Sequence, residues 1–309
     1  MSQKISRRTA LLAGAALPLV AGLGAAPVRA AAELKGASTP IHYRFTHGAF
    51  EVTALRAGTS PMDNPQQTYG LNATPEEFAE VSAAAFIPAD RSQNFFTPTL
   101  VNTGSELILF DAGLNPAGTT AALAAAGHTP DEVDIVVVTH MHGDHIGGIA
   151  GEAGVTFPNA RYVTGAIEND HWSAAGNEGY DRIIRPLADQ FTYLDDGGEV
   201  VSGITAMAAY GHTPGHMVYH IESEGQRLLV TADMANHAVW SVGRPDWEVR
   251  FDMDKPAAIE TRRRILGMLA ADRVPFLAYH LPFPAVGYVE PQGDGFRHIP
   301  VGYQLMLET

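Results

Sequence analysis

Four side chains of metal-binding type lie close together at residues 139–145, which read Thr-His-Met-His-Gly-Asp-His. They directly follow the apolar run 135–138, which predicts a buried strand. Neutral imidazole and carboxylate are ligands for zinc-class metals. A chance cluster in an ordinary core is disfavoured, because buried polar groups without partners are costly. The pattern therefore predicts a metal site at the end of a strand.

Three further apolar runs lead to a residue that can bind a metal. The run 204–209 leads to His212, the run 227–231 to Asp233, and the run 275–279 to His280. In α/β proteins, strand ends that converge at one edge of a sheet build the functional site. Together with the first cluster they give five histidines and two aspartates, more than one zinc ion needs. The set predicts two metals that share a carboxylate and a hydroxide.

This ordered set resembles the metallo-β-lactamase superfamily. It comprises His-x-His-x-Asp-His, His-Thr-Pro-Gly-His, a strand-end Asp and a late strand-end His. The resemblance implies the α/β fold of that family, a four-layer αβ/βα sandwich. It also implies a first metal site, a second site and a bridging residue: His140, His142 and His212; Asp144, His145 and His280; and Asp233. One departure is Ala232, where many relatives have Gly, and its extra methyl group bears on local geometry.

Within the superfamily the chain is similar to methyl parathion hydrolase and its lactonase-type relatives. The matching segments are 42–44, 48–55, 100–104, 280–284 (His-Leu-Pro-Phe-Pro) and 295–301. They lie toward both ends of the chain, beyond the metal motif. They favour this clade without fixing the substrate, because its members act on lactones, aryl esters and phosphotriesters.

The resemblance and the ligand set together predict a dinuclear hydrolase of lactones or esters, with a phosphotriesterase as the nearest alternative. A metal lowers the pKa of bound water toward about 7, so that a metal-bridging hydroxide attacks without a protein base. Asp144 or Asp233 then receives or relays the proton. The ligands suit two divalent ions, zinc foremost, and also accept manganese, cobalt or iron.

Three alternatives stay open. A β-lactamase is a minor one, because relatives of that activity without cysteine usually lack the bridging aspartate, and this chain has Asp233. The second is an iron-dependent oxidoreductase. Flavodiiron proteins of this kind place Glu near the position of His142 and append a flavin domain, and neither feature is present. Persulfide dioxygenases do not use the full seven-residue set. The third alternative is a metal-loaded binding protein without turnover.

Other residues are expected to support the site. Asp111 closes the apolar run 107–110 and is expected to accept from a ligand histidine, although it also suits a simple turn. His216 lies beyond Pro214 and Gly215, and we expect a structural contact there. Apolar side chains usually form small-molecule pockets. Four aromatic residues are candidates for the substrate pocket, with core packing as the alternative for each: Phe95, Phe96, Trp172 and Phe283.

The N-terminus predicts a signal for export. Residues 1–30 contain Arg7 and Arg8, an apolar run to about Leu23, and a small-residue site before Ala31. These features are typical of a twin-arginine signal peptide and indicate a periplasmic protein. The apolar run is short for a membrane anchor, which needs about 20 residues. Residues 31–309 are expected to form a single hydrolase domain, because the ligands span both of its halves.

Charge narrows the range of partners. The chain carries a formal charge of −14 and has no cysteine, so no disulfide can form. Residues 1–30 hold four basic residues and no acidic one, which leaves −18 on the remainder. Such a surface repels nucleic acids. We expect a small-molecule substrate and no stable membrane anchor, and a homodimer stays open as an alternative to a monomer.

The remaining pattern interleaves strands with helices in two comparable halves, which fits the sandwich. Strands are expected at 107–110, 160–164, 200–209, 218–222 and 228–231, and helices at 75–85, 116–126, 166–174 and 256–271. Gly147 and Gly148 follow the first cluster, where crowding of the backbone at the metals is expected to exclude larger side chains.

Overall fold

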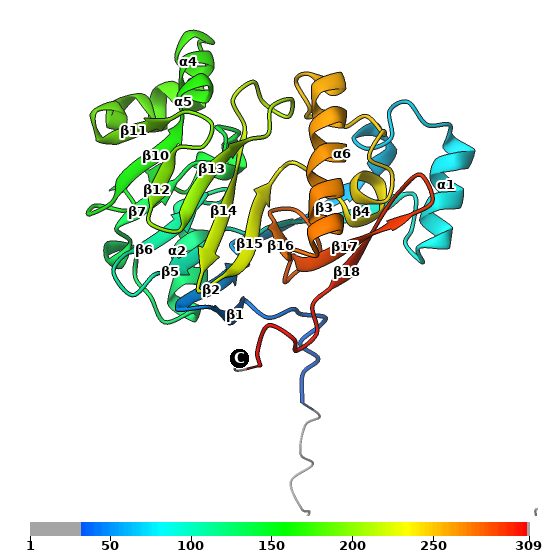
Figure 1. Cartoon of the computed structure of the whole chain (residues 1–309), viewed down its shortest axis with the longest axis horizontal. Helices are drawn as coiled ribbons and strands as arrows, with labels where there is room; N and C mark the ends of the chain where they lie inside the picture. The colour runs from blue at the N-terminus through cyan, green and yellow to red at the C-terminus, as the bar shows by residue number, and fades with distance from the viewer. Residues whose placement is uncertain (1–31, 308–309) are drawn as a thin grey trace, which may run out of the picture. The chain divides into compact units, whose positions relative to one another are not determined.

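The computed structural model describes residues 32–307 (Figure 1). The chain divides into two compact units, the first ending at Ser38 and the second beginning at Thr39. The helices and strands given below all belong to the second unit. The expected signal peptide, residues 1–30, lies outside the described residues.

The first sheet has seven strands in the order β1-β2-β5-β6-β7-β10-β11. Their bounds are β1 (His42–His47), β2 (Phe50–Leu55), β5 (Thr99–Asn102), β6 (Leu107–Phe110), β7 (Ile135–Val137), β10 (Arg161–Gly165) and β11 (Phe191–Leu194). The strands from β1 to β6 pair antiparallel, and those from β6 to β11 pair parallel. The parallel strands therefore present their carboxyl ends at a common edge, where β7 leads into the histidine cluster.

The second sheet also has seven strands, in the order β12-β13-β14-β15-β16-β17-β18. Their bounds are β12 (Glu199–Val201), β13 (Ile204–Ala208), β14 (Met217–Ser223), β15 (Gln226–Ala232), β16 (Phe276–Ala278), β17 (Val286–Gln292) and β18 (Gly295–Pro300). Only β15 and β16 pair parallel, and α6 (Lys255–Asp272) connects them. The prediction of a single strand at 200–209 was wrong, because β12 and β13 are separate strands. Gly203, with φ 85°, turns the chain between β12 and β13, and a side chain there would collide with the carbonyl of Glu222.

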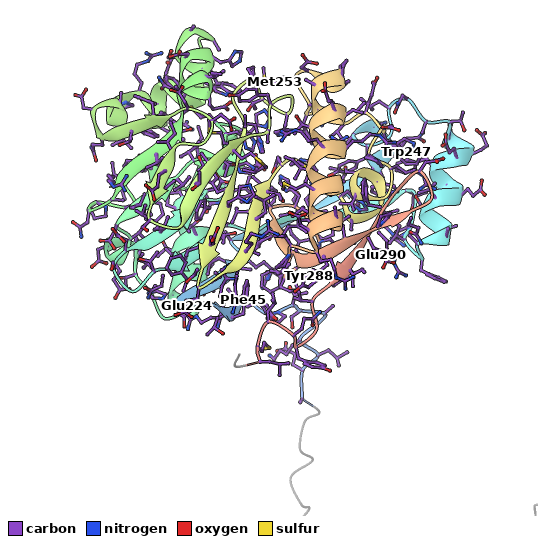
Figure 2. All side chains as sticks on the ribbon, in the orientation of Figure 1. Phe45, Glu224, Trp247, Met253, Tyr288 and Glu290 are labelled. Carbon is purple, nitrogen blue, oxygen red and sulfur yellow. The ribbon has the colours of Figure 1, made fainter. Side chains whose placement is uncertain are left out.

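Three apolar cores separate four layers, as the sandwich requires. On β6, Leu109 packs toward α2 (Pro116–Ala125) and α5 (Glu178–Ile183), while Ile108 and Phe110 pack between the sheets. This alternation follows from the period of two in a strand buried on both faces. A third core joins the outer face of the second sheet to α6, drawn in orange in Figure 1. Figure 2 shows the side chains that fill the space between these layers.

Helix boundaries follow local chemistry. Pro75, Pro116 and Pro256 lie in the first turns of their helices, where proline sacrifices no hydrogen bond. The caps Thr74, Asn115 and Asp254 accept from backbone N–H groups of those turns. The observed bounds of α1 (Pro75–Ala84), α2, α4 (Ala166–Ala174) and α6 lie within one residue of the expected ones. Within 32–307 no helix is long and apolar enough to cross a membrane.

A separate aromatic cluster packs against α1. The hairpin of β3 (Gly58–Asp63) and β4 (Arg91–Phe96) flanks α1, and a smaller hairpin joins β8 (Ala150–Gly151) to β9 (Gly154–Val155). Phe78 of α1 stacks on Trp240 and Trp247. Tyr69 lies against Trp240 in the same cluster, and Met62 of β3 packs against it.

Candidate metal centre

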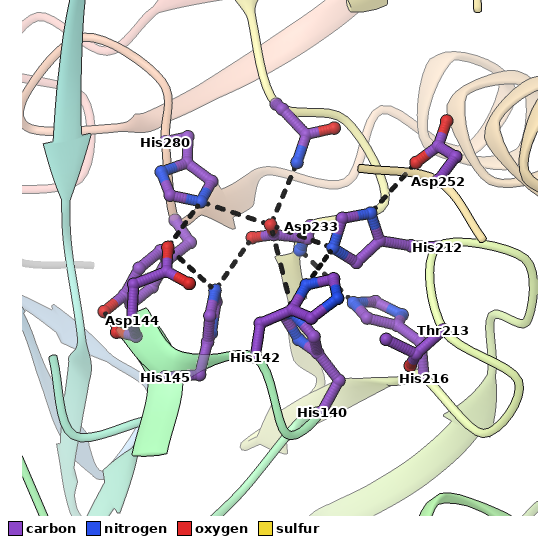
Figure 3. Close-up of polar contacts among 12 residues, drawn as sticks. His140, His142, Asp144, His145, His212, Thr213, His216, Asp233, Asp252 and His280 are labelled. Carbon is purple, nitrogen blue, oxygen red and sulfur yellow. Dashed lines mark hydrogen bonds and ion pairs between the residues drawn. The ribbon is translucent and has the colours of Figure 1, made fainter. Parts of the chain in front are cut away.

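Strand ends of both sheets deliver the seven candidate ligands to one place (Figure 3). His140 and His142 lie in the loop after β7, and Asp144 and His145 lie on α3 (Gly143–Ile146), which begins directly behind them. The others follow strands of the second sheet: His212 after β13, Asp233 after β15 and His280 after β16. Sequence reasoning placed these seven residues together, and the structure brings them together.

The first group consists of three imidazoles. The Nε2 atom of His140 lies 3.1 Å from Nδ1 of His142, and Nε2 of His212 lies 3.0 Å from the same atom. The ligand atoms of this group all lie within 4.8 Å of one another. Nitrogen lone pairs that converge in this way are suited to hold a cation.

Asp233 joins this group to a second one formed by Asp144, His145 and His280. Its Oδ2 atom lies 3.2 Å from Nε2 of His212 and 3.1 Å from Nε2 of His280, and its Oδ1 atom lies 3.3 Å from Nε2 of His145. Asp144 Oδ2 lies 3.3 Å from Nε2 of His280. One buried carboxylate thus contacts nitrogens of both groups.

Buried polar atoms without a partner show that these residues fit a metal. Nε2 of His145 and Oδ1 of Asp233 are buried and have no hydrogen-bond partner within the described part of the chain. Such atoms are rare in a native protein unless an ion or water satisfies them. The nitrogen and oxygen donors are those that zinc accepts.

The histidines of the site differ in their pKa values because their neighbours differ in charge. Burial and the neighbouring His212 lower the pKa of His142 to about 3, so this ring is neutral and free to bind a metal. Burial also lowers the pKa of His212, but its hydrogen bonds to Asp233 and Asp252 outweigh that effect and raise it to about 9. The same balance, with Asp233 and Asp144 opposing burial, raises the pKa of His280 to about 10.

Hydrogen bonds behind the ligands fix which nitrogen faces the centre. Nδ1 of His145 lies 2.8 Å from Asp111, Nδ1 of His212 lies 2.9 Å from Asp252, and Nδ1 of His280 lies 2.8 Å from the carbonyl of Phe95. A proton on each Nδ1 leaves Nε2 free as a ligand. Asp111 was expected in such a role. Asp252 was not, because nothing in the sequence connects it with a histidine 40 positions away.

Three further residues near the ligands bear on the local geometry: His216, Ala232 and Gly148. His216 lies behind the site, where its Nε2 atom accepts from the backbone N–H of Asp233 at 3.2 Å. Ala232 adopts the left-handed conformation with φ 43°, a region that favours glycine. A side chain on Gly148 would begin 1.8 Å from the carbonyl of Ala112. The crowding expected at the glycines therefore comes from neighbouring backbone rather than from the metals.

A cavity of about 460 Å³ opens onto the centre, and its wall is largely apolar. His142, Asp144, Asp233 and His280 face it from the metal side. Tyr69, Phe96, Leu114 and Phe251 form the apolar wall, and the amides of Asn94 and Asn236 complete it. Among residues 32–307, no lysine or arginine lines the cavity. Nδ2 of Asn236 also donates to Oδ2 of Asp233 at 2.9 Å.

Of the four aromatic candidates, only Phe96 lines this cavity. Phe95 is adjacent on β4 and therefore points to the other face, where it lines a separate cavity. Trp172 is buried and donates from Nε1 to Glu168 at 2.6 Å, and Phe283 lines a further cavity of about 730 Å³. These three residues therefore do not line the cavity at the centre, and a place for them in the substrate pocket stays a prediction. Sequence reasoning missed Tyr69, Leu114, Phe251 and Asn236, whose positions depend on the packing of distant segments.

The fold and the site define a class: an αβ/βα sandwich with a two-part histidine and aspartate centre at its strand ends. Residues 97–276 match the family described as the Metallo-beta-lactamase superfamily, which is more than half of the chain. The chain belongs to the metallo-beta-lactamase superfamily.

Individual relatives agree with this assignment. The chain is 31% identical over 140 residues to the Beta-lactamase-like protein 2 homolog of Caenorhabditis elegans, covering 43% of this chain and 42% of that protein. It is 32% identical over 133 residues to the N-acyl homoserine lactonase AttM of Azorhizobium caulinodans, covering 38% and 47%. The chain thus spans less than half the length of these two relatives.

A solved structure is similar over nearly the whole described domain. It is that of AidC, described as a dizinc quorum-quenching lactonase in complex with a product. The TM-score is 0.78 at 25% identity, and the match covers 85% of this chain and 99% of that one.

Proposed function

We propose that this protein is a metal-dependent hydrolase that holds two divalent ions, zinc foremost, and opens the ester bond of lactones. The observation that carries this proposal is the position of Asp233, whose carboxylate contacts nitrogens of both ligand groups at 3.1–3.3 Å. Similarity to AttM and AidC, both described as lactonases, supports lactones as the substrate class.

The ligand assignment follows from the two groups. His140, His142 and His212 would hold the first ion, Asp144, His145 and His280 the second, and Asp233 would bridge them. When bound, two such ions polarise an ester carbonyl and lower the pKa of water toward about 7. The chain then has to position the substrate, exclude water and move one proton.

Asp144 is the better placed of the two carboxylates to carry that proton. The Asp233 side chain is 4% exposed and both of its oxygens lie within 3.3 Å of histidine nitrogens, whereas that of Asp144 is 24% exposed and faces the cavity. Burial raises the pKa of Asp144, but His145 and His280 outweigh it and lower the pKa to about 2. Asp144 is therefore ionised, and its carboxylate can accept a proton and pass it to the departing alkoxide.

The apolar wall suits a substrate with an apolar chain. Phe96, Leu114 and Phe251 form a surface from which a hydrocarbon would exclude water, contributing about 0.8 kcal/mol for each buried methylene. Asn94 and Asn236 offer amide groups for the polar end of the substrate. An acyl lactone combines these two characters in an uncharged molecule.

Export is a separate part of the proposal. We propose that residues 1–30 direct the protein to the periplasm through the twin-arginine route, on the basis of Arg7, Arg8 and the apolar run that follows. A fusion of residues 1–30 to a reporter that folds before export tests this. Retention in the cytoplasm would contradict it, and Arg7→Lys with Arg8→Lys is the matched control.

The activity is tested with protein that begins at Ala31. Metal content is measured first, and hydrolysis of an acyl homoserine lactone, an aryl ester and methyl parathion is then compared at equal enzyme concentration. We expect two ions per chain and the highest kcat/KM on the lactone. A dominant rate on methyl parathion would replace lactone hydrolysis with phosphotriester hydrolysis.

The variant Asp233→Asn tests the bridging assignment. It keeps the shape of the side chain and removes its charge, so we expect metal content and turnover to fall together. Wild-type levels of both would show that Asp233 does not bridge the ions. Equal metal content with lost turnover would limit its role to the reaction.

A further inference from the structure

Glu168 is a buried carboxylate near the start of α4 that none of the reaction steps above uses. Its side chain is fully buried and accepts four hydrogen bonds. Oε1 accepts from the backbone N–H of Met141 at 2.9 Å and from Nε1 of Trp172 at 2.6 Å. Oε2 accepts from Oγ1 of Thr213 at 2.7 Å and from the backbone N–H of Gly215 at 3.0 Å. These four donors fill the acceptor sites of an ionised carboxylate.

Three of the four donors belong to the two loops that carry the first ligand group, and the fourth, Trp172, lies on α4 itself. Met141 lies between His140 and His142, and Thr213 directly follows His212. One loop follows a strand of the first sheet and the other follows a strand of the second. A single carboxylate therefore ties together loops that are more than 60 residues apart in sequence.

The approach of the second loop to α4 is close. A side chain on Gly215 would begin 2.1 Å from the backbone nitrogen of Glu168, so the loop lies directly on the first turn of the helix. Glu168 is also within that turn, where the helix dipole favours a negative charge. These contacts hold the Glu168 side chain in one conformation against the loop.

Trp172 extends the same arrangement to His142. It lies one turn further along α4, and its ring meets the ring of His142 edge-on, with centroids 5.8 Å apart and an interplanar angle of 80°. Because Glu168 accepts from the indole N–H, it also fixes the position of the Trp172 ring that contacts His142.

The chemistry of Glu168 is unfavourable for packing alone. None of its four hydrogen-bond donors is a lysine or arginine, so no cation is hydrogen-bonded to it. A buried charge without a counter-ion is costly, and an apolar side chain of similar size would fill the space. The arrangement is explained if the loops need a rigid polar link.

We propose that Glu168 is a positioning residue for the first metal: it fixes the spacing of the two loops so that His140, His142 and His212 converge before the ion binds. This inference rests on the proposed function in so far as it requires the two ions. The second site draws His280 from a segment that Glu168 does not contact, so the effect should be concentrated on the first site.

The test measures metal affinity rather than turnover. Metal-free wild type, Glu168→Gln and Thr213→Val, all beginning at Ala31, are titrated with Zn²⁺ in competition with a chelating indicator. We expect Glu168→Gln to weaken one of the two sites by about 10–100-fold, as is usual when a group that orients a ligand is lost. The other site should change by less than about threefold, and Thr213→Val should show a smaller loss at the same site.

Ser82→Ala is the matched control for loss of stability. Ser82 is buried and donates to the carbonyl of Phe78 at 2.7 Å. It also accepts from Nε1 of Trp240, at 3.0 Å, much as Glu168 accepts from Trp172. Loss of the Ser82 hydroxyl should lower the melting temperature without changing either zinc affinity. Both affinities unchanged in Glu168→Gln would overturn the inference, as would an equal weakening of both sites.

Two outcomes separate this inference from the proposed function. If Glu168→Gln fails to fold, Thr213→Val decides, and wild-type affinities in that variant would overturn the positioning role. A wild-type protein that binds fewer than two zinc ions would contradict the proposed function and the inference with it. Two ions bound by the wild type and by Glu168→Gln with equal affinity would overturn the inference alone.

Discussion

Arg262 donates to Asp252 Oδ2 at 2.7 Å, and neither side chain is exposed to solvent. The other oxygen of Asp252 contacts Nδ1 of His212 at 2.9 Å. From its position on α6, Arg262 also donates to the carbonyls of Met234, Pro245 and Trp247. One guanidinium thus holds both the carboxylate behind a candidate ligand and the segment that carries part of the cavity wall.

Replacing Arg262 by methionine should therefore be strongly destabilising. The change leaves Asp252 buried without its cation, and breaking a buried pair from one side typically costs about 3–5 kcal/mol. Urea unfolding of the metal-free protein measures the loss. Arg263→Met is the control, because Arg263 on the same helix pairs with Asp246 at the surface, where the two side chains are 41% and 56% exposed. Such a pair contributes about 1 kcal/mol or less, so equal losses would contradict the role of Arg262.

The two histidines of the His-Thr-Pro-Gly-His segment should differ in their effect on metal content. His212 offers Nε2 to the centre, whereas His216 uses Nε2 to accept from the backbone of Asp233. We expect His212→Ala to lose about one ion per chain. His216→Gln should keep both ions and lower the free energy of unfolding by about 1–3 kcal/mol, because the buried N–H of Asp233 loses its imidazole acceptor. Metal analysis together with urea unfolding distinguishes the two, and equal metal loss would show that His216 is a ligand.

Much of the fold could be predicted because it is encoded locally. The bounds expected for β6 match those observed and those of α2 lie within one residue, since an unbroken apolar run, a proline and a cap act within a few residues. The candidate ligands could be placed for a similar reason: each follows an apolar run at the end of a strand. The strand expected at 200–209 failed at Gly203, whose turn gives no apolar signal.

The residues that support the site could not be predicted in this way. Glu168 appears in the sequence as one more acidic residue of an amphipathic helix, and its function depends on two loops that approach it from different sheets. Phe251 stands in a loop without apolar periodicity. A bridge between Tyr69 and Val249, two residues before Phe251, joins this loop to a distant segment that also lines the cavity. Residue type and spacing reveal the ligands, but tertiary contacts decide what surrounds them.

Phe251 should influence which lactones are used. Its side chain lines the cavity and is 41% exposed, so it offers apolar surface to a bound chain. We expect Phe251→Ser to lower kcat/KM for a ten-carbon acyl lactone about tenfold relative to a four-carbon one, because about 1–2 kcal/mol of apolar contact is lost. Phe283→Ala tests the earlier expectation for that residue. It should change the ratio less than about twofold, and a comparable change would place Phe283 in the substrate pocket.

His298 provides a prediction for acid pH that is independent of the metals. Its ring lies edge-on to Phe276, with centroids 5.5 Å apart, and fills space beside Gly287, where a side chain would begin 2.2 Å from Nε2. Burial lowers the pKa of His298 to about 4. The unfolded chain binds this proton from about pH 6.5 downward, whereas the folded chain does not until about pH 4.

The folded state should therefore lose stability as the pH falls from about 6.5 to about 4, by up to about 3 kcal/mol from this residue, because each unit of pKa shift corresponds to about 1.4 kcal/mol. Unfolding in urea with a chelator present, at pH 8.0, 7.0, 6.0 and 5.0, measures the slope for the wild type and for His298→Gln. Other titrating groups contribute to both proteins, so the difference between their slopes isolates His298. We expect a shallower slope for the variant below pH 6.5 and equal slopes between pH 7.0 and 8.0. Parallel curves over the whole range would show that His298 takes up its proton as readily in the folded state as in the unfolded one.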